Sequence, residues 1–170
     1  MKLRLLPLLL LFAVPAAAQP APGRLVPANG EFRFSSATTL AADSALLPLA
    51  EYAAGYLGCP VRQQAAGASS VVLTLEPGDA SEAFRLEIAP GHVRIGATSP
   101  GGVFNGLQQL FRLLPPEVYA RRGVGPGTSL PCGTIEDRPR YAYRGMMLDV
   151  ARTWIDEAKV KRCIDLLSYH

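Results

Sequence analysis

A short apolar stretch followed by an amphipathic pattern constrains the fold of this chain more than any other feature. Residues 143–150 are apolar in the middle and contain no proline, which is typical of a buried strand. After Asp156, which is suited to cap a helix, apolar residues recur at helical spacing, at Val160, Cys163, Ile164 and Leu167. This pattern predicts the opening βα unit of a parallel α/β fold. Asp149 and Arg152 lie at the carboxyl end of the predicted strand, where such folds keep their ligand chemistry.

The residues before this unit predict a separate layer of helices and strands. Strands are expected at residues 25–27, 32–34 and 71–75, and a hairpin is expected to join residues 84–88 to residues 93–95. Helices are expected over residues 44–57 and 101–114, where apolar residues follow the helical period. This order predicts an α+β domain over residues 25–116. Residues 117–136 are rich in glycine and proline and predict a linker.

Composition and the N-terminus indicate an exported globular protein. The 49% hydrophobic and 18% charged residues exclude a disordered chain, and a net charge of +3 is too small to indicate a nucleic-acid partner. Residues 1–18 combine a charged start, an apolar segment and a small-residue cleavage site, so they predict a secretory signal peptide. Because the apolar segment is short and broken by proline, a membrane anchor is disfavoured. Residues 19–24 predict a flexible lead-in.

The remaining reactive residue types do not form a known catalytic or metal-binding pattern. His92 and His170 have no partner at triad or metal-ligand spacing. Cys59, Cys132 and Cys163 are odd in number and widely spaced, so they indicate neither a zinc site nor a dense disulfide framework. A bridge between Cys59 and Cys132 stays open as an alternative in an oxidising compartment.

The C-terminal residues carry a family resemblance. The ordered residues are Asp137, Pro139, Arg140, Tyr141, Tyr143, Arg144, Gly145, Leu148, Asp149, Arg152, Lys161, Asp165, Leu167 and His170. This run resembles the start of the catalytic barrel in glycoside hydrolase family 20, the β-N-acetylhexosaminidases. Upstream, residues 97–110 resemble part of the small domain that precedes this barrel. The resemblance implies an α+β accessory domain followed, over residues 137–170, by the first βα unit of a truncated (β/α)8 TIM barrel.

The resemblance also implies roles for individual residues. Arg152 matches the family's sugar-holding arginine, and its forked guanidinium can bridge two adjacent hydroxyls. On residue type alone, an ion pair with Asp149 would be the preferred reading of Arg152. Arg144 and Asp149 are expected to be structural residues at the start of the barrel, joined as a buried ion pair. Thr153 and Trp154 depart from the common family pattern.

The expected function is that of an exported β-N-acetylhexosaminidase, of which this chain is an N-terminal fragment. The family cleaves terminal N-acetylglucosamine or N-acetylgalactosamine residues by a substrate-assisted retaining mechanism, without a metal or an organic cofactor. Its catalytic Asp-Glu pair lies further along the barrel, so no residue of this chain is assigned to that pair. Two alternatives are a non-catalytic carbohydrate-binding or partner-binding module and the accessory domain of a different glycosidase.

Overall fold

The computed structural model describes residues 23–63 and 69–169 of the chain. The predicted signal peptide over residues 1–18 and most of the predicted lead-in over residues 19–24 lie outside these ranges. At the end of the lead-in, the backbone amide of Gly23 donates a hydrogen bond to the Glu136 carbonyl at 3.4 Å. Within the described ranges, helices long and apolar enough to cross a membrane are absent.

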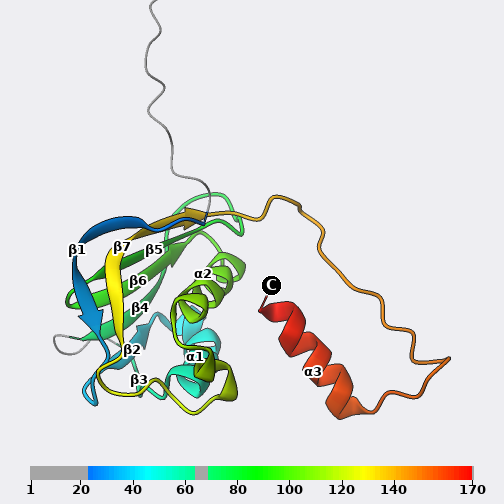
Figure 1. Ribbon diagram of the computed structural model, residues 1–170. Helices are drawn as coiled ribbons and strands as arrows, with labels where there is room; N and C mark the ends of the chain where they lie inside the picture. The colour runs from blue at the N-terminus through cyan, green and yellow to red at the C-terminus, as the bar shows by residue number, and fades with distance from the viewer. Residues whose placement is uncertain (1–22, 64–68, 170) are drawn as a thin grey trace, which may run out of the picture.

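The described residues form a mixed seven-stranded sheet in the order β1-β7-β5-β6-β4-β2-β3 (Figure 1). Strands β3, β2, β4 and β6 run parallel, whereas β6, β5, β7 and β1 are antiparallel neighbours. The strand bounds are β1 Val26–Arg33, β2 Thr39–Ala42, β3 Val61–Arg62, β4 Ser70–Leu75, β5 Phe84–Ala89, β6 His92–Ala97 and β7 Ser129–Asp137. The predicted hairpin is therefore confirmed as β5 and β6.

Helices α1, Leu47–Leu57, and α2, Pro100–Leu113, cover one face of this sheet (Figure 1). Short 3-10 turns precede and follow them, η1 at Ser44–Leu46 and η2 at Pro116–Ala120. Gly58 ends α1 in the left-handed conformation, at φ 71°, which glycine adopts without steric cost. The two helices expected from the spacing of apolar residues, over residues 44–57 and 101–114, are therefore confirmed.

The core lies between the two helices and the sheet. Leu86, Ile88, Val93 and Ile95 alternate with exposed or half-buried residues along β5 and β6, and all four are 2% exposed or less. The α2 backbone comes close to the sheet at Gly106, where a Cβ atom would fall well inside van der Waals contact of Ile95 Cγ2. Glycine therefore sets the distance between α2 and the strands.

Two expectations for the accessory domain are wrong. The strands expected at residues 25–27 and 32–34 form one strand, β1, whose register shifts between Pro27 and Glu31, because a bulge absorbs the Asn29-Gly30 turn signal. The linker expected over residues 117–136 instead contains most of η2 and of β7, which lies inside the sheet between β1 and β5. Because β7 contains Pro131 and Gly133, its sequence resembles a loop, although its Leu130, Cys132 and Ile135 are buried as in a core strand.

The strand expected over residues 143–150 is also wrong. Residues 138–156 contain no helix or strand, and Tyr143 and Met147 are 88% and 91% exposed. A barrel strand needs neighbouring strands to pair its backbone amides and carbonyls, and the described chain places none beside this stretch. The following helix is confirmed as α3, Glu157–Ser168, because Asp156 caps it locally by accepting a 2.8 Å hydrogen bond from the Lys159 amide.

All three cysteines are free thiols in the structure. Cys59 and Cys132 are buried and Cys163 is half-buried. Burial raises the pKa of the Cys59 thiol above its ordinary value, which keeps it in the neutral, unreactive form. The structure therefore does not form the Cys59–Cys132 bridge that the sequence left open.

Candidate functional site

The candidate site is the turn that contains Asp149 and Arg152. Asp149 Oδ1 accepts hydrogen bonds from the backbone amides of Ala151, at 2.9 Å, and Arg152, at 3.3 Å. One carboxylate oxygen thus holds the backbone in a closed turn, as aspartate commonly does. The structure therefore gives Asp149 a local scaffolding role next to Arg152.

The Arg152 guanidinium points into solvent. Its side chain is 91% exposed, and its Nε lies 3.6 Å from Asp149 Oδ2. An ion pair this exposed and this long contributes little to stability. Within the described residues the two terminal guanidinium nitrogens make no hydrogen bond, so they are available to a ligand.

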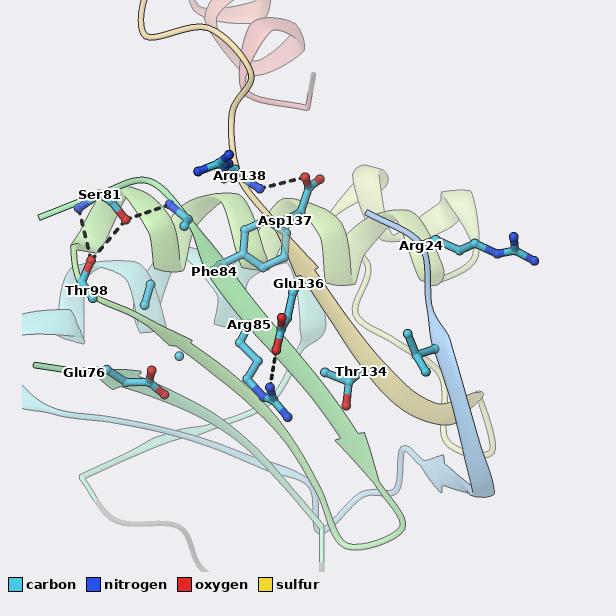
Figure 2. Close-up of a pocket in the computed structure, with 14 residues that line it drawn as sticks. Arg24, Glu76, Ser81, Phe84, Arg85, Thr98, Thr134, Glu136, Asp137 and Arg138 are labelled. Atoms are coloured by element: carbon cyan, nitrogen blue, oxygen red, sulfur yellow. Dashed lines mark hydrogen bonds and ion pairs between the residues drawn. The ribbon is translucent and has the colours of Figure 1, made fainter. Parts of the chain in front are cut away.

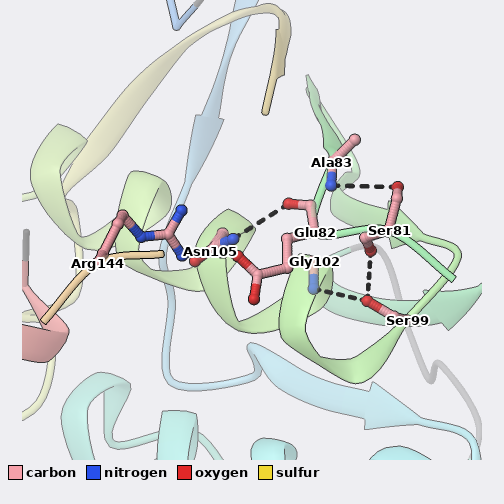
Figure 3. A network of polar contacts seen from close by, with 7 residues as sticks. All are labelled: Ser81, Glu82, Ala83, Ser99, Gly102, Asn105 and Arg144. Atoms are coloured by element: carbon pink, nitrogen blue, oxygen red, sulfur yellow. Dashed lines mark hydrogen bonds and ion pairs between the residues drawn. The ribbon is translucent and has the colours of Figure 1, made fainter. Parts of the chain in front are cut away.

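The buried ion pair expected between Arg144 and Asp149 is not formed. Arg144 Nη2 instead lies 2.6 Å from Glu82 Oε2, and both side chains are about half exposed (Figure 3). Without barrel strands around residues 143–150, nothing brings Arg144 and Asp149 together or buries them. Through this pair, Arg144 connects the extended segment, residues 138–156, to the accessory domain. A role for Arg144 at the start of a barrel stays a prediction.

Glu82 is held at the start of α2 by a small polar network. The Asn105 side-chain amide donates to the Glu82 carbonyl at 3.1 Å, and Ser99 Oγ caps α2 by accepting from the Gly102 amide at 3.1 Å (Figure 3). The Ser99 hydroxyl also donates to the Ser81 carbonyl. The helix predicted over residues 101–114 begins here as α2, whereas Glu82 was not predicted as a contact residue, because its partner Arg144 lies 62 positions away in the sequence.

A shallow hollow of about 850 Å³ lies on the sheet face that α1 and α2 leave open (Figure 2). Its lining comes from residues at or next to the ends of β1, β4, β5, β6 and β7, and Arg85 and Glu136, which lie side by side on β5 and β7, form an ion pair within it. Figure 2 shows that Arg24, at its rim, extends away from the centre. The hollow contains neither Asp149 nor Arg152, so it is separate from the candidate site.

A second hollow of about 440 Å³ separates α2 from the extended segment and the end of α3. Gln108 and Arg112 of α2 line it on one side, and Arg144 and Leu167 line it on the other. Across residues 23–63 and 69–169, clusters of three or more His, Cys, Asp or Glu that could hold a metal ion are absent. His170, the last residue of the family pattern, lies outside these residues.

Two family profiles together match most of this chain. The profile described as glycosyl hydrolase family 20, domain 2, matches residues 17–138. The profile described as glycosyl hydrolase family 20, catalytic domain, matches residues 141–170. The chain therefore belongs to glycosyl hydrolase family 20.

The relatives that this chain matches are longer than the chain. The β-N-acetylhexosaminidase of Cellulomonas fimi is 34% identical over 153 residues, which cover 82% of this chain and 29% of that protein. The β-N-acetylhexosaminidase from Streptomyces coelicolor A3(2) superimposes with a TM-score of 0.76 at 33% identity, covering 86% of this chain and 31% of that one. A mutant β-hexosaminidase from Streptomyces plicatus, in complex with its product GlcNAc, gives the same TM-score. The chain thus spans less than a third of the length of these relatives.

Proposed function

We propose that this chain is the N-terminal part of an exported β-N-acetylhexosaminidase, which removes terminal N-acetylhexosamine residues from glycans. The observation that carries the proposal is the succession of the two family profiles, with the catalytic-domain profile starting three residues after the domain 2 profile ends. The names of the relatives, β-hexosaminidase and β-N-acetylhexosaminidase, support the same activity. The signal-like sequence at residues 1–18 supports export.

The proposed mechanism is substrate-assisted hydrolysis with retention of configuration. The acetamido oxygen of the substrate attacks the anomeric carbon, an aspartate orients that group, and a glutamate acts as general acid and base. Both carboxylates belong to barrel segments that lie beyond residues 141–170. No residue of this chain is assigned to either role, so the 170 residues alone are expected to be inactive.

Arg152 is the residue of this chain that we assign to the substrate. Its exposed guanidinium, next to the turn closed by Asp149, can donate to two hydroxyls of the terminal sugar. Because charged hydrogen bonds of this kind contribute about 1.5–3 kcal/mol each, losing the forked geometry should be costly. A lysine would keep the charge but would lose the paired donors.

The test is the kinetics of Arg152→Lys in the longest product of the same gene. We expect kcat/KM on a p-nitrophenyl N-acetylglucosaminide to fall by about ten- to a hundredfold, which corresponds to the loss of one charged hydrogen bond. Arg162→Lys is the matched control, because Arg162 is an exposed arginine of α3 and should tolerate lysine. Equal kcat/KM for wild type and Arg152→Lys would count against the sugar contact.

Export and catalysis are tested separately. Mass spectrometry of protein recovered outside the cytoplasm should find a new terminus at or near Gln19, and an intact Met1 would contradict signal cleavage. A longest gene product that binds the sugar without hydrolysing it would instead favour the alternative of a non-catalytic module.

A further inference from the structure

The hollow on the open face of the sheet has a row of charged side chains on its floor (Figure 2). Arg85 of β5 lies opposite Gly96 of β6 on one side and opposite Glu136 of β7 on the other, so the three residues form one row across the sheet. Gly96 leaves room above the row for the Glu76 carboxylate, because a Cβ atom there would fall well inside van der Waals contact of Glu76 Oε1. The floor therefore presents a carboxylate, a guanidinium and another carboxylate in succession.

These charged groups keep most of their hydrogen-bonding capacity. Arg85 Nη1 and Glu136 Oε1 form an ion pair, and both side chains are more than half exposed. An exposed pair contributes little to stability, so both groups can share their bonds with a ligand. Within the described residues, the Glu76 carboxylate makes neither an ion pair nor a hydrogen bond, and Arg85 Nε and Nη2 make none either. Acceptors and donors thus lie side by side, open to a ligand.

The wall of the hollow next to Glu76 is fixed by hydrogen bonds. The Glu76 amide donates to the Ala97 carbonyl at 2.8 Å, which continues the pairing of β4 with β6. In the turn that follows, the Thr98 hydroxyl donates to the Asp79 carbonyl at 2.8 Å and accepts from the Ser81 amide at 3.2 Å. A ligand therefore meets a surface that is already ordered, so its binding costs little conformational entropy of the protein.

The charges that line the hollow balance one another. They belong to three arginines and three carboxylates, Arg24, Arg85, Arg138, Glu76, Glu136 and Asp137. The carboxylates repel the phosphates of a nucleic acid. A protein partner is disfavoured because the cores of protein interfaces are poor in charge and rich in aromatic residues, whereas Phe84, the one aromatic residue among the described lining residues, is 8% exposed. A neutral molecule rich in hydroxyl groups fits, since each hydroxyl both donates and accepts.

We propose that this hollow is a glycan-binding site of the accessory domain, and that its ligand is a neutral oligosaccharide of N-acetylhexosamine units. The choice of these sugars rests on the proposed function, whereas the site itself rests on the geometry of the hollow. All residues that line the hollow fall within the domain 2 match, residues 17–138. A glycan held on this domain stays attached between successive cleavages, which raises its effective concentration.

The test is an NMR titration of the isotopically labelled 170-residue chain with the trisaccharide of N-acetylglucosamine. We expect the amide signals of Glu76, Gly96 and Glu136 to shift as sugar is added. The signals of α1 and α2 should stay unchanged, because these helices cover the other face of the sheet (Figure 1). The concentration dependence of the shifts gives Kd for each variant.

Two carboxylates of the open face form the first matched pair of variants. Glu76→Gln keeps the size of the side chain but removes the charged acceptor, and should raise Kd about three- to tenfold. Glu87→Gln is the control, because Glu87 lies two residues from Arg85 on the same face of β5 but does not line the hollow. This variant should leave Kd unchanged.

Two glycines form the second pair. Gly96→Ala places a methyl group on the floor of the hollow, where its nearest neighbours are atoms of the flexible Glu76 side chain. The carboxylate is displaced while the core is untouched, so we expect binding to weaken roughly fivefold or more without loss of the fold. Gly125→Ala, whose methyl group meets nothing within 4 Å, is the control. Thermal unfolding of both variants checks that the domain stays folded.

Three results would overturn the proposal. They are the absence of shifts around the hollow in the wild type, equal effects of Glu76→Gln and Glu87→Gln, and loss of binding in Arg152→Lys, since Arg152 does not line the hollow. The titration does not depend on hydrolysis. Binding by this chain with an inactive longest gene product would contradict the proposed activity alone, and an active product without binding at the hollow would contradict this proposal alone.

Discussion

Large apolar side chains are mostly buried in residues 24–137 and mostly exposed in residues 138–169. In the first region most of the large apolar residues form one buried core, in which Phe32, Leu107 and Phe111 have no exposed surface. In the second region Tyr143, Met147 and Trp154 are each more than 80% exposed. The composition of the two regions is not the cause, because both contain apolar residues at regular spacing.

The two regions differ in whether their strands have neighbouring strands to pair with and helices to pack against. Every strand of the accessory domain pairs with another strand of the same domain, and α1 and α2 cover the sheet. Helix α3 satisfies its own backbone and therefore forms, although none of its residues is fully buried. Residues 143–150 would need neighbouring strands to form a strand, and so they stay extended and exposed.

Proteolysis should show the largest contrast between the two regions. Trypsin should cut after Arg140 and Arg152 at least about a hundredfold faster than after Arg85 and Arg94, because strand residues become accessible only when the domain opens. Timed digestion with mass spectrometry of the fragments measures these rates. Comparable rates at all four arginines would show that the accessory domain is not the more stable region.

Truncation of buried and exposed leucines should sharpen the comparison. Leu107→Ala removes a fully buried side chain and should destabilise the accessory domain by about 2–5 kcal/mol. Leu167→Ala, at a leucine that is 47% exposed, should change the same free energy of unfolding by less than about 0.5 kcal/mol. Urea unfolding of both variants tests this, and similar losses would contradict the division into two regions.

Two glycines, one in each of the main helices, should respond in opposite directions to alanine. Gly106→Ala places a methyl group against Ile95 and Phe84, and should destabilise the domain by about 1–3 kcal/mol. Gly55→Ala meets nothing within 4 Å and should stabilise the domain by about 0.5–1 kcal/mol through helix propensity. Thermal unfolding of the pair gives both signs, and stabilisation by Gly106→Ala would show that α2 can move away from the sheet.

Alkaline pH should produce the smallest and most gradual effect. Burial raises the pKa of Tyr52, Tyr56 and Tyr119 above their ordinary value of 10.0, so the folded chain loses these protons less readily than the unfolded chain. Their contribution to stability is complete below about pH 10 and is lost as the pH rises through the raised pKa values. Thermal unfolding from pH 8 to pH 11 measures the decline, which should be shallower in Tyr56→Phe.

The sequence predicted those elements whose signals are local. The alternating residues of β5 and β6, the apolar stripe of α2 and the Asp156 cap of α3 each lie within one element, and all were identified. Strands β2 and β3 were missed because they are only four and two residues long, too short to show an alternating pattern, and they are held by pairing with β4 and with each other.

The candidate site was predicted in part. The position of Arg152 next to Asp149 followed from sequence spacing, and the structure shows their contact. The ion pair of Arg144 with Glu82 and the ring contact of Tyr169 with Tyr119 join residues that are far apart in the sequence, so they depend on the tertiary structure. A linear reading of charges and aromatic residues contains no signal for such choices.

The position of β7 has a consequence for the order in which the domain is assembled. Among the described strands, β1 lies at the edge of the sheet and pairs with β7 alone, so the first of these strands to leave the ribosome has no partner until the last of them emerges. Long-range closure of this kind slows folding and leaves strand edges open in the meantime. A nascent chain arrested before Ser129 would therefore carry an unpaired β1 and an uncovered edge of β5, both open to the wrong partner.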